Sequence, residues 1–110
     1  MTQHDDSLYL LHMVESAQKA VKFVQGKTRV EYDRDEMLRL ALLHLIQTVG
    51  EAARNVSKSF QDDHPQIPWK AVMGIRHRIV HNYADVIWQT VTGDLPPLIE
   101  SLAKLMPPET

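Results

Sequence analysis

Apolar side chains recur along the start of the chain at intervals of three and four residues. This spacing places them on one face of an α-helix that packs a single side against a core. The stripe consists of Leu10, Val14, Ala17, Val21 and Val24. Gly26 follows as the expected end of this helix, and residues 25–32, QGKTRVEY, are expected to form a loop.

A second helix has a marked beginning. Asp33 is expected to act as its N-cap, with Glu36 closing a capping box. Tyr32 and Met37 occupy the positions of a hydrophobic staple. The pattern predicts one long helix that continues to about residue 60.

This long helix carries two apolar stripes rather than one. The first consists of Leu38, Leu42, Leu45, Val49, Ala52 and Val56, and the second of Leu43, Ile46, Gly50 and Ala53. A helix of a small bundle needs only one apolar face, so something must cover the second. Two explanations stand on an equal footing: the helix lies at the centre of the bundle, or the second stripe is a homodimer seam. Small residues in that stripe allow another backbone to approach closely.

The remainder of the chain predicts shorter helices. Prolines in residues 61–68 interrupt the chain, and Pro68 suits the first turn of a third helix over 69–83. Asp85 is expected to cap a short helix over 86–93. A last helix is expected from Asp94, with its stripe and early prolines at Leu95, Pro96, Pro97, Leu98, Ile99, Leu102 and Leu105.

No alternating strand pattern or internal repeat is present in the sequence. We therefore expect an all-α protein, an antiparallel bundle of four to five helices. Its 110 residues suit a single domain over 1–110, with residues 106–110 as a frayed tail.

Composition narrows the classes of function. The absence of cysteine excludes disulfides and thiolate metal sites. The N-terminus has acids where a secretion signal would have lysines, and no apolar run reaches membrane-spanning length. We expect a cytoplasmic protein without a membrane partner. A net charge of −2 argues against a general nucleic-acid coat protein but leaves room for a local basic site.

The densest polar cluster is RHRIVHNY, residues 76–83. On one continuous helix over 69–83, Arg76 falls at the middle of the apolar face. An arginine in apolar surroundings is costly unless it meets an anion or a carboxylate. The wheel therefore predicts that Arg76 has a negatively charged partner.

Three interpretations of this cluster compete. In the structural one, Arg76 pairs with an internal carboxylate such as Glu51 and the histidines are solvated. In the metal interpretation, His77 and His81 chelate zinc at i, i+4 spacing, but no third ligand is apparent, which makes it the least favoured. In the catalytic one, histidine carries protons and arginine binds phosphate, which suffices for RNA cleavage by the ribose 2′-hydroxyl.

Other polar residues are weaker candidates. Arg54 and Lys58 form an i, i+4 basic pair, ordinarily a solvated face, which would widen a phosphate-binding surface if it lay beside Arg76. His44, on the long helix, is expected to be a packed or interface residue.

The segment GIRHRIVHNY resembles the R-x4-H-x-Y signature of HepT-type toxins in the HEPN superfamily. Arg76, His81 and Tyr83 stand at the signature positions. LIQTVGEAARNVS is similar to the family's second helix, IPWKAVMGIRHRIVH to the beginning of its third, and VIWQTVTGDLPPLIESL to its C-terminal part. The resemblance covers nearly the whole chain.

The resemblance implies an endoribonuclease toxin that works without a metal or other cofactor and dimerises to bring two R-x4-H motifs into one cleft. Arg76 would stabilise the scissile phosphate and His81 would act as general base or acid. His77, Arg78 and Asn82 would support RNA binding, His77 standing where the family commonly has asparagine. The substrate would be an RNA such as a tRNA or an mRNA.

The resemblance also implies a protein partner, an MntA-type nucleotidyltransferase antitoxin that transfers AMP to Tyr83. Added bulk and negative charge beside an RNA-binding arginine would block the cleft. An alternative of a different class is a non-catalytic HEPN-like module that binds a nucleotide or a partner protein.

Overall fold

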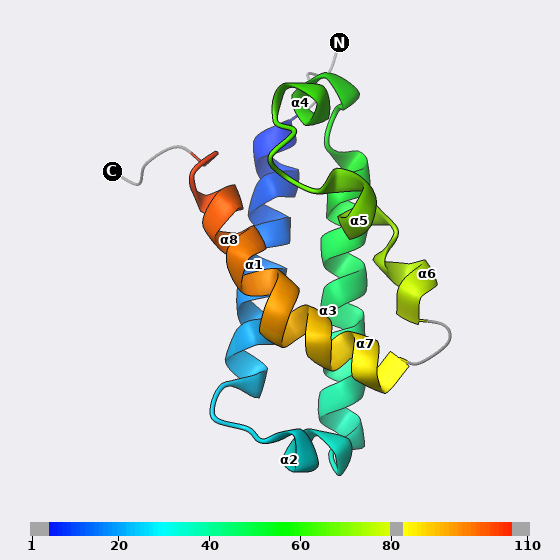
Figure 1. Cartoon of the computed structure of the whole chain (residues 1–110). Helices are drawn as coiled ribbons and strands as arrows, with labels where there is room; N and C mark the ends of the chain where they lie inside the picture. Colours follow the sequence, from blue (N-terminus) through cyan, green and yellow to red (C-terminus); the bar gives the residue numbers. More distant parts are fainter. Residues whose placement is uncertain (1–4, 80–82, 107–110) are drawn as a thin grey trace.

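The computed structural model describes residues 5–79 and 83–106, and all regular structure in these ranges is helical. Two long helices, α1 (Asp6–Val24) and α3 (Glu36–Asn55), lie antiparallel and pack along their length (Figure 1). The other elements are α2 (Arg29–Asp33), α4 (Lys58–Asp63), α5 (Trp69–Met73), α6 (Ile75–Ile79), α7 (Tyr83–Gln89), the π-helical turn η1 (Thr90–Asp94) and α8 (Leu95–Ala103). The prediction of an all-α helical fold is confirmed.

The last third of the chain forms one continuous helical segment. Elements α7, η1 and α8 follow one another without a loop and cross over α1 and α3 (Figure 1). Element α8 packs mainly on α1, whereas α7 contacts α3. The separate helices expected over 86–93 and from Asp94 are therefore a single segment, and the early prolines of α8 sit in its first turn as expected.

The apolar stripes account for the core. In α1, Leu10, Val14, Ala17 and Val24 are buried and Val21 is half-buried, and every residue of the first α3 stripe is buried. In the second α3 stripe, Ile46, Gly50 and Ala53 are buried and Leu43 is half-buried, and α5 and α6 pack against α3 at Gly50. A Cβ atom on Gly50 would lie 3.1 Å from the Val72 carbonyl oxygen and 3.5 Å from Ile75 Cγ2. The second stripe therefore needs no second copy of the chain to cover it.

The expected beginning of the long helix was wrong by two residues. Its N-cap is Asp35, whose carboxylate accepts a hydrogen bond from the Leu38 amide at 3.0 Å. Asp33 instead ends α2, a short helix inside the expected loop. The capping box lies at the start of α2, between Thr28 and Glu31. The hydrogen bond from the Thr28 amide lowers the pKa of Glu31.

The hydrophobic staple was also wrong, because its two residues have opposite environments. Tyr32 is fully buried, whereas Met37 is 82% exposed. Helix α2 directs the Tyr32 ring into the core and away from Met37.

The long helix ends at Asn55 and not near residue 60. Ser57 starts α4, because its hydroxyl accepts a hydrogen bond from the Phe60 amide at 3.3 Å. The amide and hydroxyl of Ser57 also donate to the Asp6 carboxylate, at 2.8 and 2.7 Å. These bonds hold the start of α4 against the start of α1.

The expected helix over 69–83 breaks at Gly74. The Gly74 amide donates to the Lys70 carbonyl at 2.9 Å, and the His77 amide donates to the Gly74 carbonyl at 3.0 Å. The second bond spans three residues, so α6 starts in a new register rather than continuing α5. In the part of the chain that the structure describes, no helix is long and apolar enough to span a membrane.

Candidate functional site

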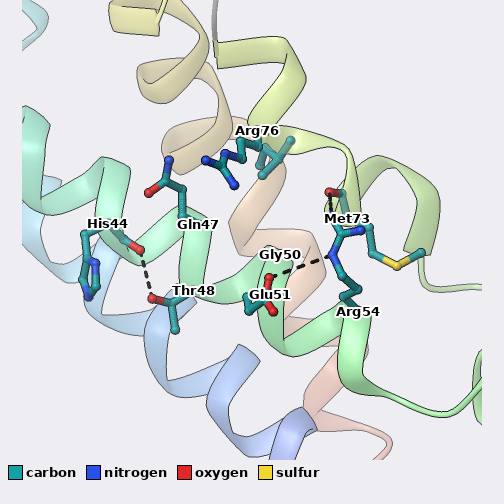
Figure 2. A pocket seen from close by; sticks show the side chains of 9 residues that line it. His44, Gln47, Thr48, Gly50, Glu51, Arg54, Met73 and Arg76 are labelled. Atoms are coloured by element: carbon teal, nitrogen blue, oxygen red, sulfur yellow. Dashed lines mark hydrogen bonds and ion pairs between the residues drawn. The ribbon is translucent and has the colours of Figure 1, made fainter.

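The break at Gly74 changes the direction of Arg76. Ile75 and Ile79 face the core and are buried, whereas Arg76 is exposed. The prediction that Arg76 lies on the apolar face was wrong, because it assumed one continuous helix. Arg76 instead lines an open pocket of about 320 Å³ between α3 and the α5–α6 segment (Figure 2).

The remaining walls of this pocket come from one flank of α3, the end of α5 and the start of α6. They comprise His44, Gln47, Thr48, Gly50, Glu51, Arg54, Met73 and Ile75. We call this space the Arg76 pocket. Two of its hydrogen-bonding groups are engaged within the chain. The Thr48 hydroxyl donates to the His44 carbonyl at 2.9 Å, and Arg54 donates to the Met73 carbonyl at 3.2 Å.

The pairing of Arg76 with Glu51, which was the example given for the structural interpretation, is not observed. The Glu51 carboxylate lies 3.9 Å from Nε of Arg54, and both side chains are largely exposed. Within residues 5–79 and 83–106, Arg76 has no ion pair. An exposed guanidinium is hydrated by solvent and does not need an internal carboxylate. Its fork of N–H donors is therefore available to an anionic ligand.

The two residues that follow Arg76 in the motif, His77 and Arg78, have different surroundings. His77 is exposed on α6. Arg78 lies at a second pocket of about 500 Å³, lined mainly by apolar side chains, and donates to the Asp94 carboxylate at 3.4 Å. The structure thus does not bring Arg78 into the Arg76 pocket.

Of the remaining predicted site residues, His81 and Asn82 lie outside the described ranges. Tyr83 is the first residue of α7 and is 41% exposed. Among the described residues, no three His, Asp or Glu side chains come together as metal ligands. Because His81 is not described, the His77–His81 pair, the least favoured interpretation, lies outside this observation.

Helix α2 fixes the start of α7 and hence the backbone at Tyr83. The Tyr32 hydroxyl donates to the Ala84 carbonyl at 2.7 Å, and burial raises the pKa of Tyr32 to about 12. Arg29 donates to the carboxylates of Asp33 and Asp85, and these bonds raise the pKa of its guanidinium.

Sequence reasoning assigned no place in the site to His44, Gln47 or Thr48. The sequence pattern that could have identified them is a row of polar residues at helical spacing on one side of α3. This row continues to Glu51 and Arg54. Arg54 does lie beside Arg76 in one pocket, which was the condition stated for it to widen a phosphate-binding surface. Lys58 does not, because it lies on α4, where its ammonium pairs with Asp62 at 2.8 Å.

Comparison with known families decides the relationship of this chain. A family model described as "Ribonuclease HepT-like" matches residues 13–105, which include α3, the Arg76 pocket and the R-x4-H-x-Y segment. The chain belongs to the HepT-like family. The resemblance seen in its motifs is thus confirmed at the level of the family.

Individual relatives agree with this HepT-like assignment. A protein of Caldanaerobacter subterraneus subsp. tengcongensis named "Putative RNase" is 28% identical over 92% of this chain and 94% of its own length. A "Probable ribonuclease HepT" of Thermococcus cleftensis is 28% identical over 88% of this chain and 92% of its own. No solved structure matches the chain. The family and these names support ribonuclease activity in this HepT-like protein.

Proposed function

We propose that this HepT-like protein is the toxin of a toxin–antitoxin pair, an endoribonuclease that cleaves RNA in the cytoplasm without a metal ion. The observation that carries the proposal is Arg76. It stands at the first position of the R-x4-H segment, exposed and without an ion pair in the described part of the chain, at an open polar pocket. A guanidinium in this setting is suited to hold phosphate oxygens.

The proposed reaction uses the ribose 2′-hydroxyl as nucleophile. A base removes the hydroxyl proton while the 2′-oxygen forms a bond to phosphorus, and the bond from phosphorus to the 5′-oxygen breaks. An acid protonates the departing oxygen, which leaves a 2′,3′-cyclic phosphate and a 5′-hydroxyl. His81 is proposed for one of these proton transfers, and His77 is the nearest candidate in sequence for the other. Arg76 stabilises the charge that develops on the phosphate.

Two copies of the chain would complete this apparatus. One chain offers a single R-x4-H segment, whereas a homodimer that places two segments in one cleft provides a second set of proton carriers and arginines. Light scattering at micromolar concentration is expected to give the mass of a dimer. A monomer at that concentration would contradict this part of the proposal.

Substitutions of the two motif residues test the activity. Arg76→Ala and His81→Ala are each expected to lower RNA cleavage by about 100-fold or more, because each removes a group that acts in the transition state. Lys58→Ala is the matched control, since it removes an exposed cation outside the pocket. Cleavage should persist in EDTA and give cyclic phosphate ends. Unchanged cleavage and toxicity in both folded motif variants would instead favour a non-catalytic binding module.

Control by the antitoxin is proposed to act through Tyr83. Its exposed ring at the start of α7 is open to an enzyme that transfers AMP. Co-expression with an MntA-type nucleotidyltransferase should add the mass of one or more AMP groups to the intact protein and abolish cleavage. An added mass that persists in Tyr83→Phe would place the modification elsewhere.

A further inference from the structure

We infer that Arg54 binds a second phosphate of the RNA, next to the scissile one, and that the Arg76 pocket is the subsite for the nucleotide between these two phosphates. The inference rests on the proposed function, because it takes the phosphate at Arg76 to be the one that is cleaved. It adds a substrate-binding residue on α3, outside the R-x4-H segment.

The two arginines come from different elements and line the same pocket. Arg54 lies in the last turn of α3 and Arg76 in α6 (Figure 2). The planar guanidinium of an arginine can donate two parallel hydrogen bonds to two oxygens of one phosphate. Successive phosphates along an RNA strand can therefore be held from opposite walls of one pocket.

The interruption between α5 and α6 at Gly74 positions both guanidinium groups. It turns Arg76 out of the core, and because the His77 amide bonds to Gly74, the Met73 carbonyl is left to accept from Arg54 at 3.2 Å. This bond anchors the largely exposed Arg54 side chain at the edge of the pocket. Less side-chain freedom remains to be lost when a ligand binds.

The size and the other walls of the pocket suit one nucleotide. Its volume of about 320 Å³ lies at the lower end of the range for small-ligand sites, about 300–1,000 Å³. The pocket is open to solvent, so a nucleotide within a longer strand can reach it. Gln47 and His44 line the α3 wall and offer hydrogen-bonding groups for a ribose or a base edge.

One carboxylate opposes an anion in this pocket. Glu51 lies 3.9 Å from Arg54, a loose contact between exposed groups, so a phosphate can displace it at little cost. The negative charge of Glu51 should nevertheless weaken the binding of RNA. Removing that charge offers an independent test.

The first experiment measures RNA binding in the His81→Ala protein, which leaves the RNA intact. A fluorescein-labelled single-stranded RNA of mixed sequence is titrated by anisotropy at several salt concentrations. Arg54→Gln is expected to weaken binding by about five- to tenfold and to lower the salt slope by about 0.7, the value for one lost phosphate contact on a single strand. Lys58→Gln should leave both within error, because its charge is paired with Asp62 outside the pocket.

Two further variants guard against a trivial loss of structure. Arg54→Lys keeps the charge and should retain most of the salt slope. Glu51→Gln should tighten binding by about two- to fivefold. If Arg54→Gln fails to fold by circular dichroism, Glu51→Gln decides, and unchanged or weaker binding in that variant overturns the inference.

Kinetics of the otherwise native protein separate this inference from the proposed function. Arg54→Gln should raise KM with kcat within about threefold, whereas Arg76→Ala should lower kcat. If the native protein cleaves RNA but Arg54→Gln and Lys58→Gln have equal salt slopes, the inference about Arg54 is overturned and the proposed function stands. Absence of cleavage combined with the expected difference in slope overturns the proposed function and leaves a phosphate-binding pocket. Absence of RNA binding counts against both.

Discussion

Two arginines on α6, Arg76 and Arg78, are separated by one residue in the sequence and line different pockets. Arg76 lies at a polar pocket against α3 and has no ion pair in residues 5–79 and 83–106. Arg78 lies at an apolar pocket against η1 and α8, where Asp94 neutralises it. Burial of Ile75 and Ile79 places the helix between these pockets.

The difference shows that a dense polar cluster does not act as one unit. On a helix, residues at i and i+2 point to nearly opposite sides. The two arginines of the motif therefore have different surroundings, Arg76 at a polar pocket open to an anion and Arg78 in an ion pair with Asp94. We expect the chemistry to follow Arg76, and the packing of the C-terminal helix to follow Arg78.

The largest expected effect is the contrast between the two arginines in cleavage. Arg76→Ala should lower activity by about 100-fold or more. Arg78→Ala should change activity by no more than about threefold, because an exposed ion pair contributes little. A quantitative cleavage assay on one RNA at fixed salt measures both. An equal loss in the two variants would contradict the division of the cluster.

A second test concerns the wall that supports both pockets. Gly50→Ala would place a Cβ 3.1 Å from the Val72 carbonyl and push α5 and α6 away from α3. Overpacking costs about 1–3 kcal/mol, against which the helix propensity of alanine returns up to about 1 kcal/mol. With the full return from helix propensity, we expect a net loss of about 0–2 kcal/mol in the free energy of urea unfolding. Cleavage should fall as well.

Gly93→Ala is the matched control for this substitution. Gly93 is exposed in the π-helical turn, and a Cβ atom there would meet nothing within 4 Å. The substitution should stabilise the protein by about 0.4–1 kcal/mol through the unfolded chain. If Gly50→Ala behaved like Gly93→Ala, the close approach of α5 to α3 would not matter for stability.

A smaller effect is expected at the apolar pocket. Thr90 is fully buried, and its hydroxyl has no hydrogen-bond partner in the described structure. Thr48 and Thr92, by contrast, donate to the carbonyls of His44 and Trp88. Thr90→Val keeps the shape and should stabilise the protein by about 1 kcal/mol, a rise of about 4 °C in Tm. Thr92→Val is the control and should not stabilise.

An effect of similar size should come from a contact that lies outside both pockets. Tyr32→Phe removes the hydroxyl that donates to Ala84 and should cost about 1 kcal/mol at pH 7. Because burial raises the pKa of Tyr32 from 10 to about 12, its favourable contribution is complete below pH 10 and is lost as the pH rises toward 12. Urea unfolding between pH 9 and 12 should show a shallower fall in stability for Tyr32→Phe than for Tyr83→Phe.

Much of the fold could be predicted from hydrophobic periodicity. The stripes of α1 and α3 are strongly periodic, and the residues of both helices that they mark for the core are buried or half-buried. The helix boundaries could not be predicted in the same way, because more than one residue near a boundary can act as the N-cap. Asp33 and Asp35 are both good N-cap residues, and only the presence of α2 decides between them.

The site was predicted less completely, because hydrophobic periodicity does not show where a helix is interrupted or which helices meet. A lone Gly74 inside a helical pattern is usually tolerated, so the wheel carried Arg76 onto the apolar face. On either side of the break, Val72 and Ile75 approach Gly50 closely, a contact between segments far apart in the chain that a helical wheel does not include. The polar flank of α3 likewise became part of the site only when α6 was placed against it.

The π-helical turn η1 adds a consequence for how the chain can vary. Ile87, Val91 and Leu95 are buried at steps of four residues, which on an ordinary α-helix would drift around the axis by about 40° each. The wider turn absorbs this drift and keeps all three against the core. Deleting one residue among the exposed positions 92–94 would put Leu95 three positions after Val91, about 60° off the shared face of an ordinary α-helix, and would rotate α7 relative to α8 by roughly that angle. The direction in which the Tyr83 side chain points relative to α8 therefore depends on the number of residues in η1, which follows the other end of α7.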